Sequence, residues 1–283
     1  DALVYIAALT PQFAPHLEPA TVSSIADVMS NLQQAAHYQY SIALDNFDTG
    51  DVHSPLTPDA VAKAQERGNM LESVVQQLGD HLADKVVAGA SVSLTTPSFE
   101  LFATKDTADN LERKFIGDGK VFVPKLESIA SGLTISVNAI AWEGAGPYFV
   151  APNETQLSSS VISVWITEGG IERRIANLTS PFLITLSVLD GNPTGRLGRK
   201  LREAAVPMGR PCHASHACVF WDDRSDRFVE DGALVLVNGT EITCAFSHLT
   251  AFGGLAAPAQ DLGEVEDLFD LDIWMSNPLG LAV

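Results

Sequence analysis

The segments CVFW (residues 218–221) and CAFSHLTAFGG (residues 244–254) combine two cysteines, several aromatic residues and the triplet His248-Leu249-Thr250. The triplet places an imidazole two residues before a hydroxyl, across one peptide bond. A hydroxyl is a weak nucleophile until a nearby base takes its proton. Neutral histidine is the side chain best matched to that role near neutral pH. The triplet therefore predicts a minimal apparatus for cutting the chain between Leu249 and Thr250.

Three residues in a row recur by chance, so the surroundings of the triplet decide its meaning. They resemble the GPS cleavage motif at the end of a GAIN domain, the self-cleaving module of adhesion receptors and polycystin-1-like proteins. The shared features are Cys218 followed by the aromatic pair Phe220 and Trp221, Cys244 four residues before the histidine, and the sequence His-Leu-Thr-x-Phe that ends at Phe252.

Two details of the motif are most similar to the polycystin-1 branch of this family. The sequence continues as Thr-Ala-Phe-Gly-Gly from residue 250, and the motif uses two cysteines. Adhesion receptors usually carry four cysteines and a second tryptophan here, whereas this chain has Phe228 near the second aromatic position. These departures favour the polycystin-1-like branch and leave the cutting residues unchanged.

The resemblance implies an intramolecular mechanism. His248 accepts the proton of the Thr250 hydroxyl, and the oxygen attacks the carbonyl carbon of Leu249. An N-to-O acyl shift leaves an ester that water hydrolyses, in a single turnover with no cofactor, no metal and no external substrate. Proximity supplies much of the rate, and the base adds roughly 10²–10⁴-fold. The attack also requires a bent, strained peptide and donors for the oxyanion.

The resemblance further implies that Cys218 and Cys244 form a disulfide that clamps the strands around the site. The bridge closes a loop of about 26 residues, for which the chain-entropy account gives roughly 3 kcal/mol of stabilisation. Phe220 and Trp221 are expected to pack in the core beside it. After cleavage, residues 250–255 are expected to remain a strand of the sandwich with Phe252 in the core. The two fragments would then stay associated, and in the family this strand can act as a tethered agonist.

The composition narrows the possible partners and location. The chain has 17 basic and 35 acidic residues and a net charge of −18, which argues against nucleic-acid binding. It contains no run of 18 apolar residues, so we expect any membrane span to lie outside this sequence. No signal peptide is visible. The chain begins with Asp rather than Met, and we expect it to be a piece of a larger protein.

Three glycosylation sequons begin at Asn153, Asn177 and Asn238. Together with a disulfide they indicate the secretory pathway. With the resemblance, they place the module on the extracellular side of the cell surface, with the ciliary membrane as a candidate location. The expected partners are the chain's own two fragments and an extracellular protein or channel subunit.

Residues 1–87 are predicted to be helical, because apolar residues recur at three- and four-residue spacings over residues 22–36 and again in a second segment. Thr57 and Pro58 mark the start of the second helix, as a cap residue followed by proline at the first helical position. A turn-rich connection is expected from Asp45 to Pro58.

From about residue 90, segments 91–95 and 133–137 alternate apolar and polar side chains, which predicts half-buried strands. Further strands are predicted over 161–166, 182–188 and 233–237, with clusters of Gly, Pro, Asn and Asp between the segments. Helices followed by strands predict an α+β fold, with a small N-terminal helical subdomain packed on a larger antiparallel β-sandwich. The resemblance divides the chain into helical subdomain A (1–87), subdomain B (88–258, with the motif at about 212–255) and an acidic juxtamembrane linker (259–283).

One further pattern resembles a metal site. Its four candidate ligands are Cys212, His213, His216 and Cys218. The spacing is too tight for a usual four-ligand zinc site, and Cys218 is better assigned to the disulfide. Cys212 is then the odd cysteine, either free and buried or paired with a partner chain.

Two loops receive structural interpretations. Residues 191–200 lack the Gly-Lys-Ser/Thr ending of a phosphate loop. They are interpreted as a solvated basic loop, with Arg196 to Arg199 as a candidate processing site for a basic-specific protease. The acidic residues between 222 and 231 do not fit the spacing of an EF-hand, so a solvated turn is predicted.

Two functions remain in view. The first is a self-cleaving extracellular module of a polycystin-1-like membrane protein, which the intact His-Leu-Thr triplet favours. The second is a non-cleaving relative that serves as an adhesion or stalk module. An enzyme that acts on external substrates has little support, because a buried site that keeps its own product strand has no room for a second substrate.

Overall fold

The structure is a computed structural model that describes residues 18–48, 58–148, 157–189, 215–222, 224–225, 227–238 and 240–257. The sequon at Asn153, the segment 191–214 with Cys212, and the acidic segment 259–283 lie outside the described residues. The helices are α2 (Pro19–Asp48), α3 (Pro58–Lys85) and the short α4 (Ala108–Leu111). The strands are β1 (Ala90–Thr95), β2 (Phe99–Thr107), β3 (Phe115–Ile116), β4 (Val121–Phe122), β5 (Thr134–Trp142), β6 (Val161–Glu168), β7 (Ile171–Arg173), β8 (Phe182–Ser187), β9 (Ser215–Asp222), β10 (Arg227–Asn238), β11 (Glu241–Phe246) and β12 (Ala251–Ala257).

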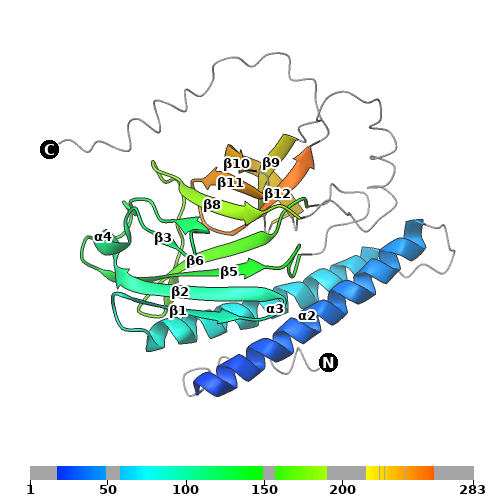
Figure 1. The fold of residues 1–283 in the computed structure, drawn as a ribbon, viewed down its shortest axis with the longest axis horizontal. Coiled ribbons are helices and arrows are strands. Elements are labelled where there is room, and N and C mark those ends of the chain that lie inside the picture. Colours follow the sequence, from blue (N-terminus) through cyan, green and yellow to red (C-terminus); the bar gives the residue numbers. More distant parts are fainter. Residues whose placement is uncertain are drawn as a thin grey trace, which may run out of the picture.

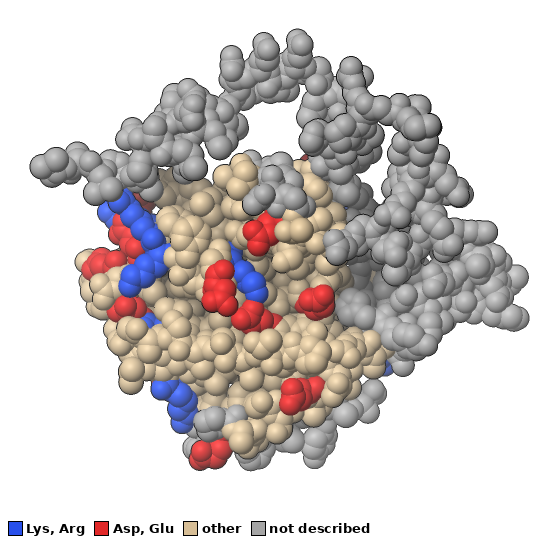
Figure 2. All heavy atoms as spheres, viewed as in Figure 1, with Lys and Arg blue, Asp and Glu red and all other residues tan. Residues whose placement is uncertain are grey.

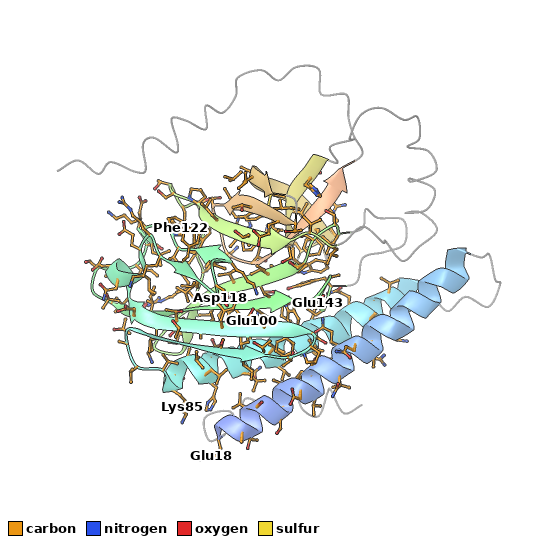
Figure 3. All side chains as sticks on the ribbon, viewed as in Figure 1. Glu18, Lys85, Glu100, Asp118, Phe122 and Glu143 are labelled. Atoms are coloured by element: carbon orange, nitrogen blue, oxygen red, sulfur yellow. A yellow bond between two sulfur atoms is a disulfide. The ribbon has the colours of Figure 1, made fainter. Side chains whose placement is uncertain are left out.

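The two long helices form an antiparallel pair. Glu18, directly before α2, and Lys85, at the end of α3, lie at the same end of the pair (Figure 3). α2 continues to Asp48, so the expectation that the connection starts at Asp45 is wrong. Helix formers such as alanine and leucine lead up to Asp45, and no glycine interrupts the chain before Gly50. No helix among the described residues is long and apolar enough to cross a membrane.

Helix α3 packs against β2 and β5, and two of its residues fit it closely to Trp165 of β6. A Cβ atom on Gly79 would lie 2.9 Å from Cζ2 of Trp165, so glycine permits this close approach. Asp80 accepts hydrogen bonds from Trp165 Nε1 (2.8 Å) and Asn138 Nδ2 (3.3 Å). Burial raises the pKa of Asp80 to about 6, although the bond from Trp165 acts in the opposite direction. The helical part is therefore joined to the sheet by specific polar contacts as well as by apolar packing.

The strands form one antiparallel sheet that curls into two layers. Among the described residues the strand order is β1-β2-β5-β6-β12-β9-β10-β11-β8-β4-β3, with β7 paired to β6. Figure 1 shows α2 and α3 on one side of β1, β2 and β5, with β8 to β12 on the other side. The predicted α+β fold, with a small N-terminal helical part and a large antiparallel β part, is confirmed.

Two apolar cores lie on the two faces of the central strands. The first, between the layers, includes both motif cysteines, Phe246 and Phe252. The second, beneath the helices, includes Trp142, Trp165 and Trp221 together with Met29 and Leu78. Strand β6 is buried along nearly its whole length, because one face contributes to each core. That explains why apolar residues occupy both odd and even positions of its sequence instead of alternating strictly with polar ones.

Strand β10 turns the corner between the layers. Its first half pairs with β9 and its second half with β11, with register shifts after Glu230 and after Leu234. Such irregularities bend a strand and increase its twist. Cys218 of β9 pairs with Gly232, and Cys244 of β11 pairs with Leu234. The bend thus brings the two cysteines together.

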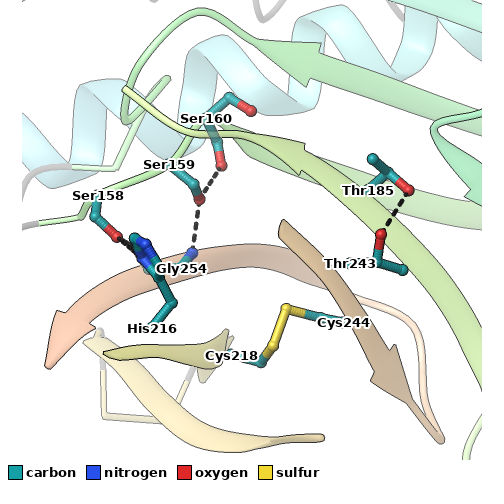
Figure 4. The surroundings of a disulfide bond; sticks show 9 residues. All are labelled: Ser158, Ser159, Ser160, Thr185, His216, Cys218, Thr243, Cys244 and Gly254. Carbon is teal, nitrogen blue, oxygen red and sulfur yellow. Dashed lines mark hydrogen bonds between the residues drawn. A yellow bond between two sulfur atoms is a disulfide. The ribbon is translucent and has the colours of Figure 1, made fainter. Parts of the chain in front are cut away.

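The Cys218–Cys244 disulfide closes this corner, with its Cα atoms 5.8 Å apart (Figure 4). A Cβ atom on Gly232 would lie 2.3 Å from Cε1 of Phe246 and 2.7 Å from Cβ of Cys218. Glycine at 232 therefore leaves the space that the disulfide and the Phe246 ring occupy. The bridge joins the strand beside β12 to the strand that leads into the candidate site.

Charged side chains on the face drawn in Figure 2 are scattered among uncharged ones. Ion pairs join Glu100 to Lys120 and Glu168 to Arg173. Over the described part of this face, the acidic side chains are therefore not gathered into one patch.

Replacing both bridge cysteines with serine should lower the free energy of unfolding by about 2–5 kcal/mol, because the bridge restricts the unfolded chain. Denaturant titration of the double variant Cys218→Ser, Cys244→Ser measures this loss. Cys212→Ser is the matched control, because it removes the one cysteine that is not part of the Cys218–Cys244 bridge. Peptide mapping that finds Cys244 as a free thiol, or joined to Cys212, would contradict the account.

Candidate functional site

The predicted scissile bond, Leu249–Thr250, lies in the four-residue connection, residues 247–250, between β11 and β12. The connection carries the chain from the layer that contains β8 and β11 to the layer that contains β6 and β9. Leu249 is half-buried against the core between the layers. The bond is therefore placed at a change of layer, where the backbone has to bend.

Backbone hydrogen bonds hold the chain on both sides of this bond. The Leu249 amide donates to the carbonyl oxygen of Ile175 at 3.2 Å. The Val164 amide donates to the carbonyl oxygen of Thr250 at 3.0 Å. Val164 belongs to β6, and Ile175 follows β7, its hairpin partner. The β6–β7 hairpin and the segment after it therefore bind both Leu249, before the bond, and Thr250, after it.

The loop after β7 makes a second backbone contact with the connection. The Leu178 amide donates to the carbonyl oxygen of Ser247 at 3.0 Å. The neighbouring Asn177 is exposed and has a positive φ of 57°, a left-handed conformation that asparagine tolerates better than most residues. The second residue of this loop's sequon, Leu178, thus contacts the connection directly, while Asn177 faces solvent.

The Thr250 hydroxyl has a fixed partner. It donates a hydrogen bond to the carbonyl oxygen of Trp221 on β9 at 3.1 Å. Because a hydroxyl carries a single proton, this contact defines where that proton points before any reaction. Transfer of the proton to His248 requires the hydroxyl to rotate away from Trp221.

Aromatic rings orient the His248 imidazole. Its ring centroid lies 4.5 Å from that of Phe220 at an interplanar angle of 80°, an edge-to-face contact. Phe252 and Phe246 lie farther away, at 6.0 and 6.2 Å. The half-buried imidazole is thus held by packing on the side of β9 that faces the core between the layers.

Successive residues of β9 serve opposite faces. Phe220 packs with the core that holds the disulfide, whereas Trp221 belongs to the core beneath the helices. The expectation that both residues lie beside the bridge therefore holds for Phe220 alone. The alternation of side chains along a strand explains the difference. Trp221 packs instead against Phe228 and Tyr148, with ring centroids 5.2 and 4.9 Å away.

The structure also locates the weaker candidates. Cys218 is taken up by the disulfide, while Cys212 and His213 lie outside the described residues. His216 Nδ1 lies 3.2 Å from Ser158 Oγ, and burial lowers the pKa of this histidine. Within the described ranges, no group of three or more His, Cys, Asp or Glu residues is placed to hold a metal ion.

Asp222 stabilises the turn between β9 and β10. It accepts hydrogen bonds from the hydroxyl of Ser225 and the amide of Arg224. These bonds, the first above all, hold the pKa of Asp222 below its usual value. The local role of this acidic residue is thus to close a turn.

Of the other two sequons, Asn153 is not described, and Asn238 is described only by its backbone at the end of β10.

The chain was compared with known proteins. A family model, GPS: GAIN subdomain B, matches residues 70–260. The match spans 191 of the 283 residues, so the chain belongs to this family. The predicted GAIN domain is confirmed, while the polycystin-1-like branch and the domain boundaries stay predictions.

Among solved structures, the chain is similar to the full extracellular region of zebrafish Gpr126/Adgrg6, at 14% sequence identity and a TM-score of 0.44. The alignment covers 86% of this chain and 33% of that one, so the chain spans about a third of the length of that structure. No match is found among curated proteins.

Sequence reasoning missed the groups that hold the scissile segment. Val164, Ile175 and Trp221 act through backbone atoms, and the side chains of the first two face the cores. Backbone contacts leave no residue-type signal, and these residues are 29 to 86 positions from their partners in the sequence. The pairing of β6 with β12 had to be known before they could be found.

Loosening the aromatic contact of His248 should slow cleavage at this bond. Phe220→Ala removes the ring that lies 4.5 Å from the imidazole, and a misplaced catalytic group can cost up to about 10²-fold in rate. Phe220→Tyr keeps a ring and should cut at nearly the wild-type rate. The cut fraction after pulse labelling provides the measurement.

Phe115→Ala is the control for this experiment, because Phe115 is 61% exposed and its ring packs on Phe122, away from the connection. A folded Phe220→Ala protein that is cut as fast as the wild type would contradict this role for the ring.

Proposed function

We propose that this chain is a self-cleaving extracellular module that cuts its own Leu249–Thr250 bond and keeps both fragments. One observation carries the proposal: the attacking residue and the bond are held together from several sides. The Trp221 carbonyl holds the hydroxyl of Thr250, the Val164 amide holds its carbonyl, and the histidine two residues earlier lies against Phe220. Attacker, target and base are thus fixed in one short connection, and such preorganisation can supply much of a reaction rate.

The reaction balances within the chain and one water molecule. The Thr250 hydroxyl gives its proton to His248, and its oxygen forms a bond to the carbonyl carbon of Leu249. The tetrahedral intermediate collapses as the C–N bond breaks, and the imidazolium returns its proton to the leaving nitrogen. Water then hydrolyses the ester, leaving a carboxylate on Leu249 and restoring the Thr250 hydroxyl beside a new amino terminus.

The contacts of β12, the strand after the proposed cut, support its retention in the fold. β12 pairs with β9 from Phe252 to Ala257, and with β6 at Ala251 and Phe252. Phe252 is fully buried in the core between the layers. Cleavage before Thr250 would remove none of these ladder contacts, so the proposal includes a retained β12.

Serines before β6 add hydrogen bonds to β12 (Figure 4). Ser159 Oγ accepts a hydrogen bond from the Gly254 amide at 2.7 Å, and the Ser158 amide donates to the Gly254 carbonyl at 2.8 Å. A Cβ on Gly254 would lie 3.0 Å from Cδ1 of Ile242. The glycine therefore lets the strand lie deep between its neighbours, and release of β12 as a tethered agonist would require all these contacts to break.

The wider context follows from the motif. The two-cysteine motif, whose disulfide is present in the structure, supports a polycystin-1-like membrane protein, with the module outside the cell and a ciliary membrane as a candidate location. Asn177 is exposed, and its sequon is proposed to carry a glycan. The proposed partners are the two fragments themselves and an extracellular protein or channel subunit.

A non-cleaving stalk module is the second candidate. The hydrogen bond from the Thr250 hydroxyl to the Trp221 carbonyl favours it, because this bond directs the hydroxyl proton to a backbone carbonyl rather than to His248. Substitutions at the site separate the two functions.

Thr250→Ala should abolish the cut and leave folding nearly unchanged, because the attacking oxygen is lost together with one hydrogen bond worth about 1 kcal/mol. Thr250→Ser should retain part of the activity, and His248→Ala should slow the reaction by roughly 10²–10⁴-fold. Denaturing gel electrophoresis of the purified variants distinguishes cut from intact chain.

Thr243→Ala is the matched control, because it removes a half-buried threonine hydroxyl from the neighbouring strand, where its partner is Thr185. It should be cut like the wild type. If Thr250→Ala is still cut at the same bond, an external protease is responsible and the proposal fails.

A further inference from the structure

One carboxylate of the helical subdomain reaches the sheet directly behind the candidate site. Glu72 of α3 accepts, on Oε1, a hydrogen bond from the hydroxyl of Ser163 at 2.8 Å and a second from the hydroxyl of Tyr148. Ser163 and Tyr148 are each 2% exposed. Trp142 Nε1 donates to Ser163 Oγ at 3.1 Å. Glu72 is thus the acceptor at the helical end of a buried polar network within an otherwise apolar core.

The Ser163 branch leads to the backbone of Thr250. Ser163 faces Ala251 across the ladder between β6 and β12. The next residue of β6, Val164, donates its amide to the Thr250 carbonyl. A displacement of β6 at Ser163 would therefore move the donor that fixes Thr250.

The Tyr148 branch leads to the hydroxyl of Thr250. The ring of Tyr148 packs on the indole of Trp221, with centroids 4.9 Å apart and an interplanar angle of 48°. The carbonyl of Trp221 accepts the hydrogen bond from Thr250 Oγ1. Val164 follows Ser163 in the chain, and Trp221 packs against Tyr148. The two residues that contact Thr250 are thus neighbours of the two hydroxyl donors to Glu72.

We propose that Glu72 is a positioning residue for self-cleavage, which aligns the Thr250 hydroxyl and carbonyl through Ser163 and Tyr148. The inference rests on the proposed function and adds to it a contribution from the helical subdomain. Tyr148 Oη and Ser163 Oγ lie 3.1 Å apart and can bond to each other. Removing the Glu72 acceptor therefore takes the acceptor from one of the two buried hydroxyl protons, and regaining one requires a shift of the groups around it. Cleavage is therefore sensitive to how α3 lies on the sheet, although no atom of α3 takes part in the reaction.

The test compares the rate of cleavage in three substitutions of this network. Glu72→Ala removes the acceptor and should slow cleavage roughly 10- to 10²-fold, as expected for a misplaced reacting group. Glu72→Gln keeps an oxygen at the same position and should recover most of the wild-type rate. Tyr148→Phe keeps the ring on Trp221 but removes one bond to Glu72, and should lie between the two.

Each variant is expressed as the full 283-residue chain, and its cut fraction is followed by pulse labelling. Thermal unfolding is measured for the same variants in a Thr250→Ala background, where no cut can occur and stability is compared at equal covalent structure. Glu66→Ala is the matched control, an exposed glutamate of the same helix, and should match the wild type in both measurements. Recovery by Glu72→Gln is the readout that a general loss of stability would not produce.

The outcomes separate this inference from the proposed function. An intact wild-type chain would end both. A cut wild type with a folded Glu72→Ala variant that is cut equally fast would overturn the role of Glu72 and leave self-cleavage standing. A Glu72→Gln variant as slow as Glu72→Ala would also overturn it. If Glu72→Ala does not fold, Tyr148→Phe decides, and wild-type cleavage in that variant would reject the proposal.

Discussion

The position of β12 between β6 and β9 is the constraint on which the rest of the structure depends. In the described sheet, β12 joins the half that contains β1, β2, β5 and β6 to the half that contains β9, β10, β11, β8, β4 and β3. The fold therefore needs this strand whether or not the peptide before it is intact. The proposed cut, directly before its first residues, would spare every ladder contact, so the same placement would serve both stability and the proposed retention of the strand.

Strand β9 connects that constraint to the chemistry of the site. It is the partner of β12 over six residue pairs, and the disulfide fixes it to β11, the strand that leads into the scissile connection. Its neighbouring residues Phe220 and Trp221 face opposite cores. One contacts the imidazole, and the other contacts Tyr148 while its carbonyl holds the Thr250 hydroxyl. The positions of the His248 imidazole and the Thr250 hydroxyl thus both depend on the position of β9.

Local patterns in the sequence predicted part of this fold and resemblance predicted another part. Helical periodicity located α2 and α3, and alternation or apolar runs located β1, β5, β6, β8 and part of β10. The sequence of β12, AFGGLAA, has no strand pattern, since adjacent glycines argue against one. Its strand character was expected from the resemblance alone. The structure supplies the reason for those glycines, because Ile242 and Leu157 leave only 3.0 Å to a Cβ at Gly254 and Gly253, respectively.

The candidate reacting residues stand out in the sequence because the His-Leu-Thr triplet is contiguous, but the groups that contact them do not. Val164 and Ile175 act through the backbone, and Glu72 is 91 residues from Ser163, so no local spacing reveals the contact.

The measurement that tests the central claim most directly combines native mass spectrometry of the purified wild-type protein with N-terminal sequencing of the fragments released by denaturation. The account predicts one native species that separates into two polypeptides, the smaller of which begins Thr-Ala-Phe at Thr250. A chain that stays whole after denaturation, a different new terminus, or loss of the smaller polypeptide under native conditions would contradict it.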